Sequence, residues 1–195
     1  LVHVSTSIGA TLTDNQSNTW TGLTLTGAGI TSRWFYVVSP ITSGSHTFTA
    51  TETGGFPSLV VLALTGTATT SPFDVENGTN GINVESLQPG SVTPVENNEV
   101  LVVGLAFAGS STKSIGSGFT IQHQANTTAN AWGIAAAYKI QTTTGAENPL
   151  WSWTPGADAA TRIATFKAAA NASTSQLRHL LIRSDLARPY AVGRF

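Results

Sequence analysis

Hydrophobic and polar residues alternate with a period of two through most of the chain, and turn residues interrupt the pattern about every ten residues. Ser45–Thr51 is a clear example, because His46, Phe48 and Ala50 alternate with hydroxyl side chains. Side chains of a strand point alternately to its two faces, so this segment predicts a strand with one core face and one solvent face. The same alternation in residues 33–38 and 119–124 predicts further strands.

Two segments, Leu59–Leu64 and Val100–Ala108, are apolar throughout instead of alternating. Such runs are typical of strands that are covered on both faces, so we expect both to be central strands. In Ala131–Ile140 the large side chains fall on one face of the predicted strand, while Ala and Gly line the other. The small face predicts close approach of a neighbouring sheet or subunit.

Turn residues separate the predicted strands, and this punctuation predicts about eight to ten antiparallel strands. That number favours an all-β, antiparallel two-sheet sandwich of the jelly-roll type over a seven-stranded immunoglobulin domain. We expect the sandwich to cover residues 31–170, with an N-terminal edge strand or arm in residues 1–30. The turn pairs include Ser39-Pro40, Asn77-Gly78, Asn80-Gly81, Pro89-Gly90, Asn148-Pro149 and Pro155-Gly156.

The pattern changes after residue 170. Leu177, Leu180 and Leu181 lie at helical spacing, Ser173–Ser175 supplies N-cap candidates, and Pro189 would end the helix. The sequence therefore predicts a C-terminal amphipathic helix followed by an extended end. Because an isolated helix of about a dozen residues is marginally stable in water, the helix needs a surface to dock on, in this domain or in a partner.

Charge divides the chain at the same point. Five Lys and Arg face nine Asp and Glu up to residue 170, whereas residues 171–195 carry four Arg and one Asp. A frayed terminus seldom has so many apolar side chains, and apolar anchors interleaved with arginine are typical of a peptide that orders on a partner. We therefore predict a basic docking tail whose contact residues are Leu177, Arg178, Leu180, Leu181, Arg183, Leu186, Arg188, Tyr190 and Phe195.

Charged residues make up only 10% of the chain, well below the quarter or so that is usual in soluble domains. Hydroxyl and amide side chains replace them, which suits proteins outside the cytosol or proteins that pack against copies of themselves. The absence of Cys excludes disulfides and thiolate metal sites. No stretch approaches the roughly 20 apolar residues of a membrane span, and the net charge of −1 argues against a nucleic-acid partner.

Catalytic patterns are missing from the sequence. His46 and His123 fall on apolar strand faces, where a satisfied core or rim histidine is more common than a catalytic one. Glu96 and Glu99 flank a predicted turn, which favours a solvated turn over an opposed carboxylate pair. One acidic segment contains oxygen ligands suited to calcium but lacks EF-hand order, so an Asx-type turn is the simpler interpretation for Asp74, Glu76, Asn77 and Asn80. We expect no catalytic residue, metal or cofactor.

Trp151 and Trp153 are the candidates for binding a glycan. They are two positions apart and therefore share one face of a predicted strand. If that face is outward, the two indoles form an exposed aromatic platform for a sugar. Packing between the two sheets is the competing interpretation and the one we favour.

The strand-and-turn segments resemble a group of jelly-roll domains in phage virion proteins, both head decoration and fibre components, and in some secreted bacterial adhesive proteins. The resemblance covers about Arg33–Ala169 and gives no catalytic residues. The segments that carry it are Ser45–Thr49, Phe56–Val61, Ser71–Gly78, Ser91–Pro94, Asn98–Val103, Gly118–Ile121, Ala135–Gln141, Asn148–Trp153 and Ala164–Ala168.

From this resemblance and the tail we expect a non-enzymatic virion structural protein. It would be a decoration or cement module on a phage particle, located in the virion or outside the cell, forming a homo-oligomer and contacting capsid or tail components. The alternative is a carbohydrate-binding module of a tail fibre or secreted adhesin. A concanavalin-like glycan hydrolase is the weakest interpretation, because no carboxylate pair stands out on one strand.

Overall fold

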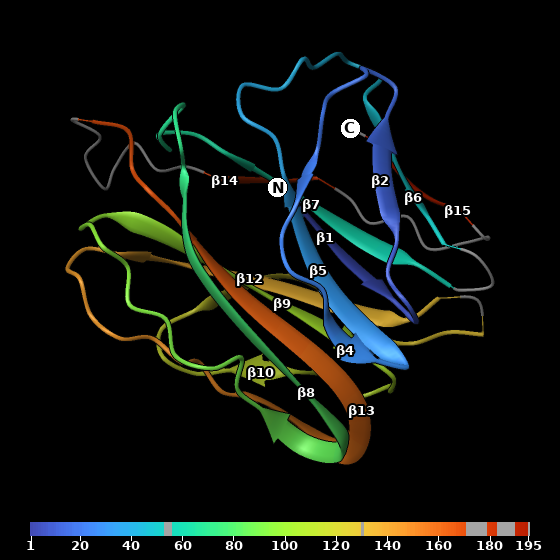
Figure 1. Ribbon diagram of the computed structural model, residues 1–195. Helices are drawn as coiled ribbons and strands as arrows, with labels where there is room; N and C mark the ends of the chain where they lie inside the picture. Colours follow the sequence, from blue (N-terminus) through green and yellow to red (C-terminus); the bar gives the residue numbers. More distant parts are fainter. Residues whose placement is uncertain (53–55, 130, 171–178, 183–189, 195) are drawn as a thin grey trace.

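The computed structural model describes residues 1–52, 56–129, 131–170, 179–182 and 190–194, and within these residues all regular secondary structure is β (Figure 1). In these described ranges, fifteen strands form three antiparallel sheets. The predicted all-β, antiparallel class is therefore confirmed. The number of strands exceeds the prediction because several are only two to four residues long, too short to show as alternation, and because a third sheet is present.

The first sheet has the order β14 (His179–Ile182), β7 (Ser58–Leu64), β1 (Val2–Thr6), β5 (Ile30–Tyr36) and β3 (Thr21–Gly22), with β4 (Thr26–Ala28) also on β5. The second has the order β10 (Ser114–Ile115), β13 (Trp151–Phe166), β9 (Glu99–Phe107), β12 (Gly133–Gln141) and β11 (Thr120–Ala125), with β8 (Phe73–Leu87) on β13. The third has the order β15 (Tyr190–Arg194), β6 (Thr47–Thr51) and β2 (Thr11–Asp14).

Apolar clusters lie on both faces of the first and second sheets. Trp34, Val60 and Val102 belong to the cluster that joins these two sheets, while Phe35 and Phe48 belong to the cluster that joins the first sheet to the third. Every residue of β9 is buried, as are the first five of β7. The prediction that both apolar runs are strands covered on two faces is confirmed.

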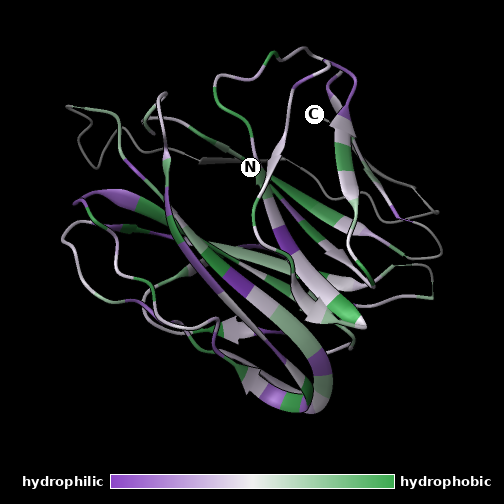
Figure 2. Ribbon diagram, in the orientation of Figure 1, coloured by the Kyte–Doolittle hydropathy of each residue, from purple (hydrophilic) through white to green (hydrophobic). Residues whose placement is uncertain are grey.

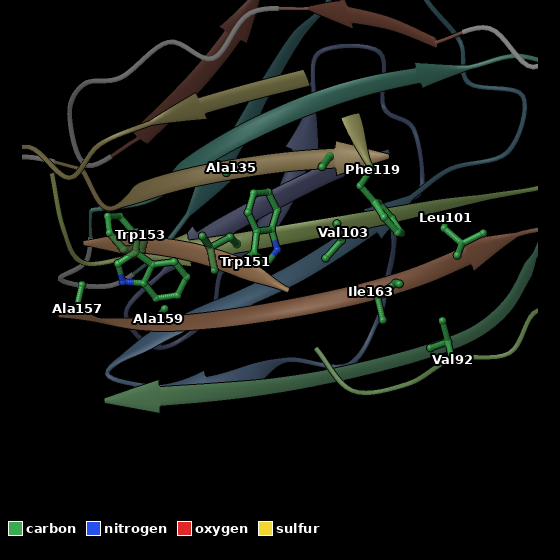
Figure 3. Packing of buried hydrophobic residues seen from close by; sticks show 13 residues of the cluster. Val92, Leu101, Val103, Phe119, Ala135, Trp151, Trp153, Ala157, Ala159 and Ile163 are labelled. Carbon is green, nitrogen blue, oxygen red and sulfur yellow. The ribbon is translucent and has the colours of Figure 1, made fainter. Parts of the chain in front are cut away.

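The small face of β12 is covered by side chains of its own sheet and the adjoining loops, and not by the neighbouring sheet or subunit that the sequence predicted. Ala135 and Ala137 lie in the cluster on the outer side of the second sheet, together with Trp151 and Phe119. Figure 3 shows these side chains gathered over the second sheet, with the indoles pointing into the cluster. Large aromatic rings on neighbouring elements therefore fill the space that the alanines leave open.

The N-terminal segment corrects a prediction, because β1 is a central strand between β5 and β7 and not an edge strand. All five of its residues are buried, three of them polar. Each of these polar side chains makes an internal hydrogen bond, although His3 Nδ1 has no partner among the described residues. His3 Nε2 lies 2.8 Å from Ser32 Oγ, Ser5 Oγ donates to the carbonyl of Gly133 at 3.0 Å, and Thr6 Oγ1 lies 2.8 Å from Thr31 Oγ1. These hydrogen bonds offset the cost of removing the polar side chains from water, so β1 can lie in the core without being apolar throughout.

The buried His3 ring predicts that replacement of Gly104 destabilises the fold. A Cβ at Gly104 would lie 2.3 Å from His3 Cδ2, so the His3 ring or one of the strands β1 and β9 must shift. We expect Gly104→Ala to lower the free energy of unfolding by about 1–3 kcal/mol, in the range of an overpacked core. Urea denaturation measures the change, with Gly44→Ala, where an added Cβ meets open space, as the matched control. Equal losses in the two variants would contradict this packing.

The long β8–β13 ribbon passes through three predicted turns, which is a second correction. Asn77-Gly78 and Asn80-Gly81 lie inside β8, and Pro155-Gly156 lies inside β13 where the register shifts. Glycine is needed at 78 for a packing reason, since a Cβ there would lie 2.4 Å from Thr26 Oγ1. Figure 2 shows alternating hydrophilic and hydrophobic residues at the curled end of this ribbon.

A largely buried ion pair within this ribbon is hydrogen-bonded to the first sheet. Arg162 Nη1 of β13 lies 2.7 Å from Glu76 Oε2 of β8, and Arg162 Nε donates to Thr26 Oγ1 of β4 at 2.8 Å. Glu76 Oε1 also accepts from the Thr24 hydroxyl at 2.6 Å. The guanidinium thus has partners on both sides, as a buried charge requires.

The C-terminal tail is extended where the structure describes it, so the predicted helix is wrong for residues 179–182. These residues form β14, which pairs with β7, and residues 190–194 form β15, which pairs with β6. An unpaired strand edge offers a row of N–H and C=O groups to the tail, whereas a short helix gains little by itself. The rest of the predicted helix and its N-cap lie outside the described residues.

Candidate docking site

A cavity of about 500 Å³ opens between the first and third sheets, where β5, β6 and β7 meet the following loops. Its volume lies in the range of binding pockets, about 300–1,000 Å³. Aromatic and aliphatic side chains form most of the wall, and hydroxyl groups from the loops around 39–43 and 67–69 form the remainder. The apolar wall includes Trp20, Tyr36, Phe48, Leu62, Leu64 and Phe166.

One wall of the cavity is fixed by a buried carboxylate. Asp14 Oδ2 lies 3.2 Å from His46 Nε2 and accepts from Trp20 Nε1 at 2.9 Å, while His46 stacks on Phe48. Burial raises the pKa of Asp14, but hydrogen bonds from Asn18, His46 and Trp20 outweigh it and hold that pKa below its usual value. His46 is thus a satisfied histidine at the rim of the core, as predicted, and the cluster holds two aromatic rings in place.

Both described strands of the tail run beside this cavity. β14 pairs with Val61–Leu64 of β7, and all four of these residues line the cavity. β15 pairs with β6, which contributes Phe48 to the lining. β15 also approaches β7, so the tail borders both walls. β14 has four residues and adds to the edge of the first sheet, and β15 has five and adds to the edge of the third sheet. The tail therefore lies at the edges of two different sheets.

Only three of the predicted docking residues fall on the described tail strands. Leu180 and Leu181 lie in β14 opposite Ala63 and Leu62, and Tyr190 lies in β15 opposite Thr51. The other six are outside the described residues, namely Leu177, Arg178, Arg183, Leu186, Arg188 and Phe195.

The glycan platform predicted as an alternative is absent at Trp151 and Trp153. The two indoles are 0% and 4% exposed, and the Trp153 ring packs edge-on against Phe107 at 5.1 Å between centroids. Figure 3 shows both side chains directed into the cluster on the second sheet. Their faces are used by core packing, so neither is available to stack on a sugar.

The acidic segment considered for calcium is part of β8, and its side chains have separate partners. Glu76 pairs with Arg162, Asp74 Oδ2 accepts from the Val95 N–H at 2.9 Å, and Asn77 Nδ2 donates to the Ser91 carbonyl at 3.1 Å. Among the described residues, no group of three or more His, Cys, Asp or Glu is placed to hold a metal ion.

Glu99 is fully buried, which differs from the solvated turn that the sequence suggested, whereas Glu96 is exposed. Burial raises the pKa of the Glu99 carboxyl; the Thr165 hydroxyl and the Glu96 N–H oppose this, and the nearby charge of Asp74 adds to the rise. Glu99 Oε1 accepts the Glu96 N–H at 3.0 Å, and Asp74 holds Val95. The two carboxyls therefore hold the 95–99 turn against β8 and β13, which is a structural use.

This raised pKa predicts stability that depends on pH. A carboxyl with a higher pKa in the folded than in the unfolded state stabilises the fold below its unfolded value of 4.5, and this stabilisation is lost as pH rises through the folded value. Glu99→Gln keeps an acceptor for the Glu96 N–H and removes the titration. We expect urea unfolding to show a smaller loss of stability from pH 4.5 upward in Glu99→Gln than in the parent chain. Parallel pH profiles would contradict the raised pKa.

No local pattern in the sequence marks the cavity, because its wall comes from parts of the chain that are distant in sequence: residue 1 and segments near residues 20, 36–48, 61–72 and 166. The sequence set the tail apart by its charge and apolar content, but it did not indicate the strands β6 and β7 with which the described tail strands pair. The described residues contain no helix long and apolar enough to cross a membrane. In comparisons with protein-family models, curated proteins and solved structures, no significant match to the chain was found.

Proposed function

We propose that this chain is a non-enzymatic structural protein of a virion: a jelly-roll-like decoration or cement module, displayed on a phage particle and anchored by its C-terminal tail. Its partners are other virion proteins of the capsid or tail and further copies of itself, and its location is the virion or the extracellular space. The observation that carries the proposal is the pairing of the tail with the edges of two different sheets.

The pairing supports an anchoring role because strand addition is a common way for an extended segment to bind a folded domain. Main-chain hydrogen bonds supply affinity, and pockets beside the strand supply specificity. Here the paired edges, β6 and β7, border an apolar cavity. A tail that fits such a receptor is suited to holding neighbouring molecules together.

Composition supports display on a particle surface. Charged residues make up 10% of the chain, and several strands carry a hydroxyl-rich face, such as Thr47, Thr49 and Thr51 of β6. The antiparallel sheets packed face to face are compatible with a jelly roll, although the third sheet is an addition to the expected two. Such a surface remains soluble through hydroxyl and amide groups and places few charges between crowded copies.

The test is binding of the purified protein to particles that lack it. Reversing two tail charges, Arg183→Glu with Arg188→Glu, is expected to abolish co-sedimentation with the particles, because the altered tail is acidic and is repelled by an acidic scaffold. Arg183→Lys with Arg188→Lys keeps the charge and is the matched control. Unchanged binding of the charge-reversed protein, or no binding of the parent chain, would refute tail anchoring on a particle.

The carbohydrate-binding alternative loses its residues, since Trp151 and Trp153 are in the core. A glycan role would require another aromatic surface. For this reason the structural role is the function that we put forward.

A further inference from the structure

Two strand edges face the same cavity, and the tail covers both. β7 pairs with β1 along one edge and with β14 along the other, and β6 pairs with β2 along one edge and with β15 along the other. The cavity of about 500 Å³ lies between them. We call the part of the chain up to residue 170 the body. The described part of the body offers two strand edges to which further strands can add, with the apolar cavity beside them.

The body needs these strands irrespective of which molecule supplies them. Without β14 and β15, the backbone groups of Val61–Leu64 and Thr47–Thr51 are left without strand partners on one side. An edge of this kind pairs readily with another chain, and β7 is largely apolar. Pairing through the backbone depends on register and not on chain connectivity, so the tail of another copy fits the same edges.

Charge and length also permit a tail from another copy. The tail carries four Arg against one Asp, and the body five Lys and Arg against nine Asp and Glu, so each tail is complementary in charge to any body. Eight residues, 171–178, separate residue 170 from the first residue of β14. Eight fully extended residues span at most about 26–29 Å, which limits how far the tail can reach from its own chain. That reach is comparable to the diameter of a small domain.

We propose that the tail is exchanged between copies: in the assembled protein, β14 and β15 of one chain pair with β7 and β6 of a second copy of this chain. Intrachain pairing is the closed, unassembled form of the same contacts. The inference rests on the proposed structural role and specifies its partner. Exchange links neighbouring molecules without any new interface, as in domain swapping.

Single cysteines at paired positions test this exchange, because the chain has no cysteine of its own. Ala63 of β7 and Leu180 of β14 are register partners, and Ala63 is exposed. Directly opposed residues of antiparallel strands have Cα atoms about 4.5–5.5 Å apart, within the range that a disulfide spans. Full-length Ala63→Cys and full-length Leu180→Cys, each with a different affinity tag, are co-expressed, purified through both tags and oxidised.

Exchange predicts a covalent heterodimer with twice the 20.2 kDa mass of one chain on a non-reducing gel, lost on reduction. The matched control replaces Ala63→Cys with Thr120→Cys, an exposed position on β11 of the second sheet, and is expected to give no heterodimer above background. The double variant Ala63→Cys with Leu180→Cys in one chain shows whether the register is correct.

Two results would overturn the inference. If the double variant closes within one chain and the co-expressed single variants give no heterodimer, the tail is a fixed strand of its own molecule. If neither experiment gives a disulfide, the tail does not pair with the β7 edge in this register, and exchange of the tail through that edge is refuted. Heterodimers without any particle binding would instead refute only the virion role, so the two proposals fail separately.

Discussion

The full chain is expected to form an oligomer of fixed size, and a chain ending at Ala170 is expected to lose it. The shorter chain keeps the strands that form the facing layers of the first and second sheets but leaves one edge of β7 and one edge of β6 unpaired. We therefore expect monomers at low concentration and association without a fixed size at high concentration, because free edges pair non-specifically. Multi-angle light scattering over a concentration series measures both properties.

Proline substitutions in β14 separate the loss of pairing from the loss of residues. Leu180→Pro with Leu181→Pro removes two backbone N–H groups in full-length protein, so whichever of them faces β7 is lost. Leu180→Ala with Leu181→Ala keeps both N–H groups and is the matched control. The proline variant is expected to behave like the shorter chain. Identical, well-folded monomers for the parent chain, the shorter chain and the proline variant would contradict a role of the tail in self-assembly.

Hydrophobic periodicity predicted the strands whose burial depends on apolar side chains. In β6 the buried His46, Phe48 and Ala50 follow the alternation of the sequence, with His46 directly before the strand, and β9 is buried throughout as its apolar run indicated. These strands are predictable because burial of apolar area is the main favourable contribution to folding, so it leaves a direct record in sequence. The all-β class follows from several such segments.

Strands that are buried through hydrogen bonds left no such record. β1 has the polar residues His3, Ser5 and Thr6 in the core, and they become compatible with burial only through partners on β5 and at Gly133. Gly78 was also misinterpreted because its partner is distant in sequence. The Asn-Gly pair is typical of a turn, but in the structure the glycine lies within a strand and allows the close approach of Thr26. Contacts between residues this distant along the chain are not visible to a local pattern.

The tail shows how an edge overrides local preference. Leu177, Leu180 and Leu181 have helical spacing, yet residues 179–182 are extended against β7. Helix spacing and a run of Leu, Leu and Ile are both compatible with this segment, and the sequence alone contains no information on the free edge that decides between them. The unusual charge and apolar content of the tail are visible in the sequence, whereas the pairing of its described strands with β6 and β7 beside the cavity required the topology.

Trp151→Ala is expected to lower the free energy of unfolding by about 3–5 kcal/mol, the usual cost of truncating a buried Trp or Phe. The ring is completely buried, in a cluster with Phe119, Ala135 and Ile163 (Figure 3). Among the described residues its Nε1 has no hydrogen-bond partner, so the loss comes from apolar packing and the cavity left behind. For a chain of this length the midpoint of thermal unfolding should fall by about 6–20 °C, as calorimetry would measure.

The neighbouring Leu150 provides the matched control, because its side chain is 42% exposed and Leu150→Ala should change stability by less than about 0.5 kcal/mol. Comparison of the two variants also decides between the roles considered for Trp151. A tryptophan that serves as a sugar platform would tolerate truncation with little loss of stability and would lose glycan binding. A core tryptophan loses much stability on truncation and has no glycan binding to lose. An unchanged unfolding midpoint in Trp151→Ala would therefore contradict the core role and make Trp151 and Trp153 candidates for sugar binding again.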